Sequence, residues 1–382
     1  MKIIYITTSI EENDYVEFSK TWSVSLNPSN QNFHNKVIRA LAISNQLEVI
    51  SIRPFSKRRC SLKRLSAEDK IVNNISYHYL RIPRHKLFKA ISIKSQFKKF
   101  IAHNQEKAVV VTDTINPSCV QLAAIAKKKY HIPCIGICTD SPANISGTNR
   151  AYALFTMNNT KHMDGYLTLT DELNNLFNPN GQKHLTFEGI VESKEIEKTD
   201  VKGKYVFFGG ALLPRYGVYE LIEAFKKIKN EDISLLICGH HGNEEKINLA
   251  INGDNRIKFL GTLPVKEVLA LEGNAIVNVN PRPFTKELDR LSIPSKTLEY
   301  LSSGALTISV KNTELEKKFN DCAIWSKSGN VDDLYFALTK ALSMTANERK
   351  YVAEKAKNIA KSLYSIEKIG KLLTDFLSTF ID

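Results

Sequence analysis

Two kinds of hydrophobic pattern alternate along the chain. Short, continuous apolar runs are typical of strands buried in a parallel sheet, and apolar residues at every third or fourth position are typical of helices. The apolar runs predict strands at residues 2–7, 47–52, 75–82, 108–112, 133–138, 165–170, 205–208, 234–238, 256–260, 275–279 and 305–310. The helical spacings predict helices at residues 33–44, 86–101, 117–130, 171–177, 218–228, 264–271, 332–344, 347–363 and 365–381. This alternation predicts an α/β fold with doubly wound, Rossmann-like sheets.

A polar stretch divides the chain. Residues 192–204, ESKEIEKTDVKGK, have no apolar periodicity, which is the expected character of a linker. A chain of 382 residues is also too long for one ordinary hydrophobic core. We therefore predict a first Rossmann-like domain at residues 1–195 and a second one at residues 204–364.

The stretch 278–304 carries the clearest chemical signal. It reads NVNPRPFTKELDRLSIPSKTLEYLSSG, in which Pro294 and the final glycine predict the start and the end of a helix. A helix N-terminus presents unpaired N–H groups and partial positive charge, and Lys296 adds a cation in the first turn. We predict that Pro294, Ser295 and Lys296 bind a diphosphate. Glu299 follows one turn later, where its carboxylate can accept hydrogen bonds from ribose hydroxyls.

These residues resemble a known family. The run NPRP…IPSKTLEYLSSG is similar to the donor-site segment of the group 1 (family 4) glycosyltransferases, especially of the bacterial capsule and exopolysaccharide branch, and the resemblance is strong over residues 204–310. It implies the GT-B architecture, in which two Rossmann-like domains face each other across a cleft and the last helix, here 365–382, packs back on the first domain. It also implies transfer of a sugar from a nucleotide-diphosphate sugar, with a UDP-sugar favoured, and retention at the anomeric carbon. No metal and no cofactor is expected besides the nucleotide sugar, which is a co-substrate.

The glycine-rich turn after strand 205–208 is the second part of the expected donor site. Such a turn lets backbone amides approach phosphates, and Gly210 lies in it. Where the family has an Arg and a Lys, this chain has Ala211 and Tyr216, so we assign the phosphate contact to the neighbouring Arg215. The alternative is that Arg215 is an ordinary surface residue. By resemblance, the turns after the next two strands border the nucleotide at Gly239 and Leu263.

One departure from the family keeps a second interpretation open. The family often has two glutamates eight residues apart, and Leu291 takes the place of the first one here. The capsule-type branch often lacks this glutamate too, so we interpret the change as a character of that branch. The alternative is a catalytically silent GT-B subunit that binds and supports a partner glycosyltransferase.

Polar residues after strands in the first half are candidates for binding the acceptor, because ligands of open α/β sheets bind outside the carboxyl ends of strands. Asp140 follows a predicted strand, and we expect it to orient an acceptor hydroxyl or to stabilise positive charge at the sugar carbon. A polar loop with Asn27, Asn30 and Gln31 takes the place of the Gly-Gly loop that the family often has after the first strand. In both places the alternative is a helix cap or turn without a substrate contact.

The expected catalytic residues combine the two halves of the chain. Arg215 and Lys296 would offset the charge of the leaving diphosphate, and Asp140 would act at the acceptor. By resemblance, the acceptor is a growing, lipid-linked glycan at the inner face of the membrane.

Positive charge is concentrated in one segment of the first half. The formal charge of the chain is +13, and the segment from Arg53 to Lys107 contains fifteen Lys and Arg residues against three acids. Such a segment attracts anionic lipids, nucleic acids or phosphorylated substrates. Within it, the predicted helix 86–101 has lysines interleaved with a stripe of apolar residues, namely Leu87, Ile91, Phe97 and Ile101. This helix either rests on an anionic membrane or packs on the core with a solvated face. Nucleic acid is not expected, because the segment has neither interleaved base-stacking aromatics nor a known binding motif.

The remaining features indicate a cytoplasmic enzyme that binds the inner membrane face peripherally. The chain begins with MKIIYITTS, which does not resemble a signal peptide, and no apolar run approaches the roughly 20 residues of a membrane span. The six cysteines are scattered, without the spacing of metal ligands, so we expect buried free thiols and no metal site.

Overall fold

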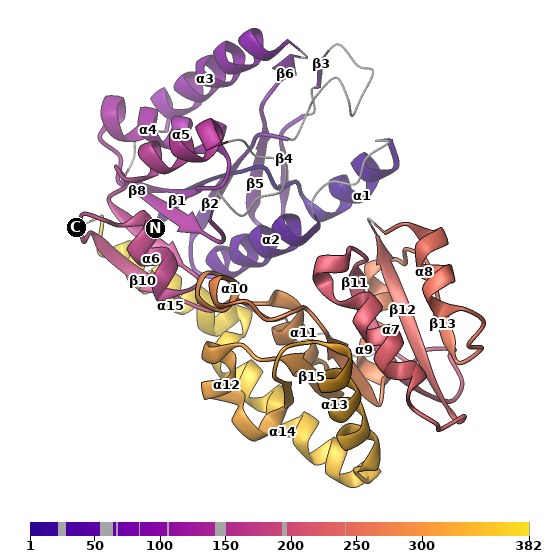
Figure 1. The fold of residues 1–382 in the computed structure, drawn as a ribbon. Helices are drawn as coiled ribbons and strands as arrows, with labels where there is room; N and C mark the ends of the chain where they lie inside the picture. Colours follow the sequence, from indigo (N-terminus) through magenta and orange to yellow (C-terminus); the bar gives the residue numbers. More distant parts are fainter. Residues whose placement is uncertain are drawn as a thin grey trace. The chain divides into compact units, whose positions relative to one another are not determined.

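The computed structural model describes residues 1–21, 28–53, 64–65, 68–83, 85–104, 107–141, 150–192, 197–240 and 242–381. The chain divides into two compact units, and each is built on a twisted, mainly parallel sheet (Figure 1). Unit 1 consists of Met1–Ile190 together with Ile366–Asp382, and unit 2 consists of Val191–Ser365. The α/β fold that the hydrophobic pattern predicts is confirmed in both units.

The sheet of unit 1 has the strand order β10-β9-β8-β7-β1-β2-β5-β4. Its neighbouring strands are parallel except for β4 and β5 at one edge. The strands are β1 (Lys2–Thr7), β2 (Gln46–Ser51), β4 (Lys70–Val72), β5 (Ile75–Tyr79), β7 (Ala108–Asp113), β8 (Cys134–Cys138), β9 (Gly165–Thr168) and β10 (Lys183–Thr186), and a separate antiparallel pair consists of β3 (Arg64–Leu65) and β6 (Ile82–Pro83). The chain winds outward from β1 in one direction and from β7 in the other, which is the doubly wound topology.

Helices cover both faces of this sheet. They are α1 (Glu12–Thr21), α2 (Pro28–Ala42), α3 (Lys86–Ala102), α4 (Pro117–Tyr130), α5 (Arg150–Thr160) and α6 (Asp171–Phe177). In Figure 1, α3, α4 and α5 gather on one side of the sheet, and α2 lies on the other. Because both faces are covered, β7 is buried along its whole length and β1 along nearly all of it. This double burial is the reason that these strands read as continuous apolar runs.

The last helix, α15 (Ile366–Ser378), belongs to unit 1 although it follows unit 2 in the sequence. Its buried apolar residues are Ile369, Leu373 and Leu377. The helix lies very close to α2, because a Cβ atom added at Gly370 would be 2.4 Å from the carbonyl oxygen of Ala40. Asn45 Nδ2 also donates a hydrogen bond of 2.8 Å to Thr374 Oγ1. A glycine at this crossing lets the two helix backbones approach.

The sheet of unit 2 is parallel, with the strand order β13-β12-β11-β14-β15-β16. Its strands are β11 (Lys204–Ala211), β12 (Ile233–His240), β13 (Ile257–Phe259), β14 (Val277–Asn280), β15 (Leu306–Val310) and β16 (Ile324–Ser326). Its helices are α7 (Val218–Lys226), α8 (Glu244–Ile251), α9 (Val265–Asn274), α10 (Lys286–Leu291), α11 (Ser295–Ser303), α12 (Thr313–Phe319), α13 (Val331–Ser343) and α14 (Ala346–Tyr364), with short 3-10 turns at η2 (Pro214–Tyr216) and η3 (Asn320–Cys322).

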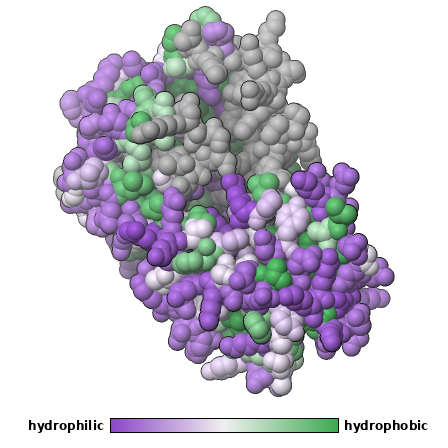
Figure 2. Space-filling model, in the orientation of Figure 1, coloured by the Kyte–Doolittle hydropathy of each residue, from purple (hydrophilic) through white to green (hydrophobic). Residues whose placement is uncertain are grey.

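Alternate residues of β11 face two separate cores. Val206 and Phe208 pack in the cluster that contains the apolar stripe of α7. Tyr205 and Phe207 point the other way and pack against Leu271 near the end of α9. Successive side chains of a strand face opposite sides, so a central strand needs apolar residues at every position. Outside the cores, the described residues that are visible in Figure 2 are mainly hydrophilic, with small separate hydrophobic groups.

The structure differs from the predicted elements where polar sequences form helices. Helices α1, α5, α8, α10 and α12 were not predicted, and of these α1 and α10 have no clear apolar stripe. In α10, the side chain of Thr285 caps the helix by accepting a hydrogen bond of 3.1 Å from Leu288 N. The prediction that Asn30 and Gln31 lie in a loop was wrong. They lie in α2, which begins earlier than predicted, at Pro28, and proline is well suited to the first turn of a helix.

Candidate functional site

The strand order of unit 2 has a switch point at the neighbouring strands β11 and β14, and a ligand is expected there. From β11 the chain winds to β12 and β13, and from β14 it winds in the opposite direction to β15 and β16. Ligands of doubly wound sheets bind outside the carboxyl ends of the strands at such a switch point. The first candidates are therefore the residues that follow β11 and β14.

Two arginines meet at one tyrosine ring at this switch point. The guanidinium carbon of Arg215, in η2 after β11, is 5.1 Å from the centroid of the Tyr216 ring. The guanidinium carbon of Arg282, which follows β14, is 5.9 Å from the same ring. The two loops also touch, because a Cβ atom on Gly217 would be 2.1 Å from the carbonyl oxygen of Pro281. Arg215 is exposed, and Arg282 was missed although it lies in the NPRP run. Guanidinium groups bind phosphate oxygens with two donors each.

The carboxyl ends of β11 and β12 approach each other at two predicted donor residues, Gly210 and Gly239. Gly239 has a φ of +155°, and a Cβ atom there would be 1.7 Å from the carbonyl oxygen of Gly210. Gly239 N donates a hydrogen bond of 2.9 Å to Gly261 O, and Thr262 Oγ1 donates one of 2.9 Å to Gly239 O. Leu263 follows directly and is half-buried. The two glycines therefore let the ends of β11 and β12 approach each other closely.

The start of α11 lies on the other side of the switch point. Pro294 is the N-cap of this helix, with φ −72° and ψ 96°, and the first helical residue is the exposed Ser295. The prediction that Pro294 is the first helical residue was therefore wrong by one position. The side chain of proline makes no capping hydrogen bond, so the first turn keeps the partial positive charge of a helix N-terminus. The helix ends at Gly304, in the left-handed conformation, as predicted.

Lys296 lies between two carboxylates rather than pointing into solvent. Its Nζ is 2.6 Å from Glu272 Oε1 and 3.1 Å from Glu299 Oε2. The side chain of Glu272 is only 1% exposed, whereas those of Lys296 and Glu299 are 31% and 30% exposed. Desolvation lowers the pKa of Lys296, but the charges of Glu272 and Glu299 outweigh it and raise the pKa well above its usual value. Lys296 is therefore cationic at neutral pH. Glu272 was not among the residues predicted from the sequence.

Tyr300 ties this cluster to the end of β11. Its hydroxyl accepts a hydrogen bond of 3.0 Å from Gly209 N and donates one of 3.2 Å to Gly209 O. Lys296 Nζ is 5.4 Å from the centroid of the Tyr300 ring, so the ammonium also has a cation–π contact. The residue is buried, and burial raises the pKa of its hydroxyl. Helix α11 is thus fixed to the strand whose loop carries Arg215.

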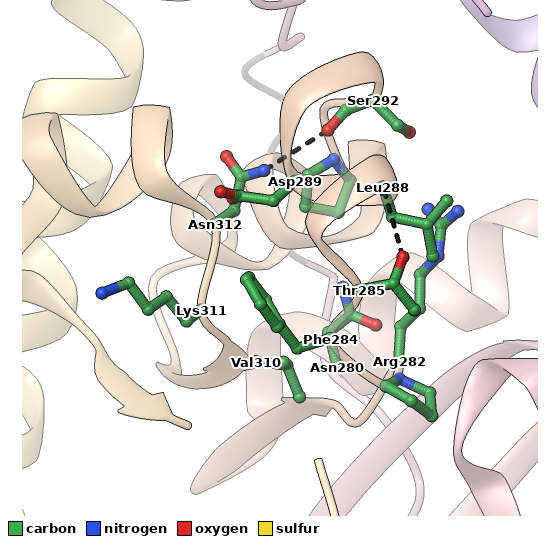
Figure 3. Close-up of a pocket in the computed structure, with 12 residues that line it drawn as sticks. Asn280, Arg282, Phe284, Thr285, Leu288, Asp289, Ser292, Val310, Lys311 and Asn312 are labelled. Atoms are coloured by element: carbon green, nitrogen blue, oxygen red, sulfur yellow. Dashed lines mark hydrogen bonds between the residues drawn. The ribbon is translucent and has the colours of Figure 1, made fainter. Parts of the chain in front are cut away.

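A pocket open to solvent adjoins the start of α11 (Figure 3). Its empty space, which includes open solvent at the mouth, is about 330 Å³. Figure 3 shows Arg282 and Lys311 on opposite sides of the pocket, with Phe284 between them. The complete lining consists of Asn280, Arg282, Pro283, Phe284, Thr285, Leu288, Asp289, Ser292, Pro294, Val310, Lys311 and Asn312. Amide, hydroxyl, guanidinium and aromatic groups are the types that bind a sugar ring.

The predicted acceptor residues Asn30 and Gln31 lie beside the loop that follows β1. Gln31 is buried, its Oε1 accepts a hydrogen bond of 2.9 Å from Ile10 N, and its Nε2 donates to Ile10 O. Asn30 Nδ2 donates a hydrogen bond of 3.3 Å to Thr8 Oγ1. In this structure Gln31 therefore holds the backbone of the loop. An acceptor contact of either residue stays a prediction, and Asn27 lies outside the described residues.

Asp140 lies at the carboxyl edge of the sheet in unit 1, after β8. It is half-buried, and its Oδ1 accepts a hydrogen bond of 2.8 Å from Ser141 N. The switch point of unit 1 is between β1 and β7, so Asp140 is one strand further along the edge. Its role at the acceptor stays a prediction.

A buried polar group that the sequence analysis missed lies under the switch point of unit 1. Tyr5 Oη and His34 Nδ1 are 2.6 Å apart, and His34 Nε2 is 3.5 Å from Asp113 Oδ2. His34 is fully buried, and desolvation lowers its pKa despite the nearby carboxylate. The histidine is therefore neutral at pH 7 and joins α2 to the sheet.

The sequence predicted that the whole basic segment lies on the surface. In the structure, part of it is buried. Arg53 is fully buried, and its guanidinium carbon is 4.8 Å from the centroid of the Tyr79 ring. Desolvation lowers the pKa of Arg53 to about 10. Including this residue in a surface patch was therefore wrong. Residues 54–63, 66–67, 84 and 105–106 of the segment lie outside the described residues.

Helix α3, in the same segment, has two distinct sides. Its core side consists of Ile93, Phe97 and Ile101, which are buried. The prediction that Ile91 shares one apolar stripe with Phe97 and Ile101 was wrong, because Ile91 is 65% exposed whereas the other two are buried. One turn before it, Phe88 is 63% exposed. Helical spacing places Lys98 and Lys99, both exposed, on this outer side as well. The helix therefore packs on the core and also presents apolar and basic groups to solvent.

Two kinds of feature are absent from the part of the chain that the structure describes. Among them, no group of three or more His, Cys, Asp or Glu side chains is arranged so that it could hold a metal ion. Over the same ranges, every helix is too short or too polar to cross a membrane.

Comparison with known proteins connects unit 2 to a family. Residues 190–359 match the family of the glycosyl transferases group 1, and this range covers nearly all of unit 2. No curated protein sequence matches the chain significantly.

Solved structures share the fold of the whole chain at 10–12% sequence identity. Sucrose-phosphate synthase from Thermosynechococcus elongatus superimposes with a TM-score of 0.73 at 12% identity, over 99% of both chains. Anabaena HepE, in complex with UDP and glucose, has a TM-score of 0.68 at 12% identity, over 99% of this chain and 100% of its own. An α,α-trehalose-phosphate synthase (UDP-forming) from Burkholderia xenovorans, in complex with glucose-6-phosphate, has a TM-score of 0.69 at 10% identity, over 99% of both chains.

The two findings agree with each other. The family match covers the unit whose switch point carries the arginines and the α11 start, and the structural likeness covers both units. The chain is therefore a glycosyltransferase with two Rossmann-like domains of the GT-B fold, and residues 190–359, which include most of its second domain, match the glycosyl transferases group 1.

Proposed function

We propose that the chain transfers a sugar from a nucleotide-diphosphate sugar, with a UDP-sugar favoured, to a hydroxyl of a growing, lipid-linked bacterial surface glycan. The observation that carries this proposal is the gathering of Arg215, Arg282, the α11 start and Glu299 around the switch point of unit 2. Supporting it, the structurally similar HepE is solved with UDP and glucose, and one similar trehalose-phosphate synthase is UDP-forming.

The reaction needs positive groups near the leaving diphosphate. When the bond between the anomeric carbon and the phosphate oxygen breaks, negative charge grows on that oxygen. Two guanidinium groups and a helix N-terminus would offset this charge without waiting for solvent to reorganise. We propose on this basis, and on the family resemblance, that transfer proceeds with retention and needs no metal. Glu299 would bind the ribose, and the backbone at Gly210, Gly239 and Leu263 would border the base.

We assign the transferred sugar to the pocket beside Pro294. Leu291 stands where the family often has the glutamate near the sugar, so other groups have to recognise the sugar hydroxyls. The pocket offers Arg282, two asparagines and the ring of Phe284 immediately next to the α11 start. This assignment keeps the sugar within reach of the diphosphate site. On the acceptor side, Asp140 and Asn30 remain our candidates in unit 1.

We also propose that unit 1 rests on an anionic membrane, because a lipid-linked acceptor has to be met at a membrane surface. The support is the outer side of α3, where Phe88 and Ile91 are exposed and Lys98 and Lys99 lie on the same side. Apolar groups next to lysines are typical of helices that lie in the interface of anionic lipids. The protein would then act at the cytoplasmic face of the inner membrane as a peripheral enzyme.

The test is a thermal-shift screen against UDP, GDP, ADP, CMP and their sugars, repeated with Glu299→Ala. A ligand that binds only the folded protein raises its stability by mass action, by about 2.7 kcal/mol at 100 times its Kd. We expect UDP and one UDP-sugar to raise the melting temperature of the wild-type protein. The Glu299→Ala variant should lose most of this shift while its own melting temperature stays close to that of the wild type, because Glu299 is partly exposed. No shift with any nucleotide would contradict the proposal.

A further inference from the structure

We propose that Glu272 is a positioning residue of the donor site, which acts on the ribose-binding Glu299 through Lys296. The inference rests on the proposed function, since it concerns how that site holds a nucleotide. The three side chains come from two helices, with Glu272 near the end of α9 and the other two in α11. Lys296 Nζ bridges them, at 2.6 Å from Glu272 and 3.1 Å from Glu299.

The fold alone does not need a carboxylate at position 272. Two residues close to it in the chain, Leu271 and Ala275, belong to the apolar core cluster that also contains Tyr205 and Phe207 of β11. Burying an ion costs several kcal/mol, and well-packed apolar residues often replace a buried ion pair without loss of stability. The side chain of Glu272 is nevertheless only 1% exposed, whereas the Lys296 side chain with which it pairs is 31% exposed. A charge held at this depth is expected where it fixes the geometry of a neighbouring site.

The charge balance of the cluster indicates what Glu272 does. Two carboxylates surround one ammonium, so the three residues together carry one negative charge. Lys296 is shared between the two carboxylates, and its shorter contact is to Glu272. Glu299 therefore keeps the capacity to accept hydrogen bonds from ribose hydroxyls, in an orientation that the ammonium fixes. Without the charge of Glu272, Lys296 would pair with Glu299 alone and compete with the ribose.

The experiment is a comparison of UDP with 2′,3′-dideoxy-UDP, which lacks the ribose hydroxyls, in the wild type and in Glu272→Gln. We expect the wild type to bind UDP about tenfold more tightly than the dideoxy analogue, the effect of roughly one good hydrogen bond to a charged group. In Glu272→Gln this ratio should fall to about 2 or less, as in Glu299→Gln. Inorganic diphosphate, which has no ribose, should bind the variant at least as tightly as the wild type, because the site has lost one negative charge.

A merely structural effect would give a different result. If Glu272→Gln only loosened the domain, UDP, the dideoxy analogue and diphosphate would all bind more weakly and their ratios would not change. Asp254→Asn is the matched control, because Asp254 is an ion-paired, half-buried carboxylate of the same unit, 2.7 Å from Arg256 Nη2, before β13. This variant should keep the wild-type ratio.

The outcomes separate the inference from the proposed function. Failure of the wild type to bind UDP would overturn both. Binding of UDP with the same ratio in Glu272→Gln and in the wild type would overturn only the role of Glu272. If Glu272→Gln does not fold, the double variant Glu272→Gln/Lys296→Met removes both charges and leaves no uncompensated buried ion. It should show the same fall in the ratio, because Glu299 loses the ammonium that orients it.

Discussion

Position 239 requires a glycine, because the ends of β11 and β12 leave no room for a side chain there. Its φ is +155°, and a Cβ atom would be 1.7 Å from the carbonyl oxygen of Gly210, so Gly239→Ala requires the backbone of β11 or β12 to move. We expect this variant to lose at least about 1–3 kcal/mol of stability from overpacking, and to lose binding of UDP, because the strand ends that border the nucleotide are displaced. Thermal unfolding and UDP titration measure the two effects.

Gly253→Ala is the matched control for this prediction. Gly253 also has a positive φ, +75°, but no atom lies within 4 Å of the position of its Cβ. The substitution should cost only the strain of the left-handed conformation, about 1–2 kcal/mol, and UDP binding should stay as in the wild type. Equal losses of stability and of UDP binding in the two variants would show that the close contact between Gly239 and Gly210 does not matter for either property.

At the residue scale, some candidate site residues are easier to predict from the sequence than others. Residues that follow a strand or a helix start can be predicted, whereas residues that reach the site only through the packing of two elements cannot. Arg215, Ser295 and Glu299 could be proposed from the sequence because each has a fixed place after a strand, at a helix start or one turn beyond it. Glu272 is one of two glutamates in the helix 265–274, and nothing in its spacing distinguishes it. Only the packing of α9 against α11 places it beside Lys296. Arg282 was visible in the NPRP run, but its contact with Tyr216 depends on the three-dimensional approach of two loops.

A negative charge added at the start of α11 should have opposite effects on stability and on UDP binding. Ser295 is the first residue of this helix and is exposed. In Ser295→Asp, the added carboxylate should stabilise the helix N-terminus by about 0.3–1 kcal/mol. The same charge should repel the diphosphate and weaken UDP binding about tenfold, which is the effect of about 1.4 kcal/mol. We therefore expect a higher melting temperature without ligand and a smaller shift with UDP.

Ala346→Asp is the control, and it tests whether the weaker UDP binding is specific to the start of α11. Ala346 is the exposed first residue of α14, after the N-cap Thr345, so its substitution places the same charge at a helix start that is not part of the proposed site. It should raise stability by a similar amount and leave UDP binding unchanged. If Ser295→Asp binds UDP as tightly as Ala346→Asp does, the α11 start does not hold the diphosphate.

At the scale of elements, the accuracy of the sequence analysis follows burial. Strands such as β1 and β7 were predicted nearly to the residue, because double burial makes them continuously apolar. The same is true of α4, where Asn116 caps the helix by accepting a hydrogen bond of 2.9 Å from Ser118 N. By contrast, α10 is a short helix without buried residues, so its sequence has no apolar stripe to detect.

At the scale of the whole molecule, topology was predictable and the use of surfaces was not. The order of strands and helices predicted two doubly wound sheets, since few other folds bury this alternation. The charge of +13 and the basic segment, however, predicted only that some anionic partner exists. The structure divides that segment, because Arg53 is buried against Tyr79 while α3 presents an outer side with Phe88 and Ile91.

This outer side of α3 leads to a prediction for the intact protein. The double variant Phe88→Ser/Ile91→Ser should bind vesicles of phosphatidylglycerol about tenfold more weakly than the wild type, because burying one such side chain contributes about 1.5–3 kcal/mol and interfacial insertion is partial. Co-sedimentation measures this binding, and raising the salt concentration should weaken it further, since the exposed Lys98 and Lys99 contribute by attraction to anionic lipid. The control is Leu249→Ser/Val265→Ser, which removes two equally exposed apolar residues from unit 2. Both proteins should keep the UDP-dependent thermal shift. If the two double variants bind the vesicles equally well, α3 is only a core-packed helix with a solvated side, and the acceptor has to reach the enzyme by another surface.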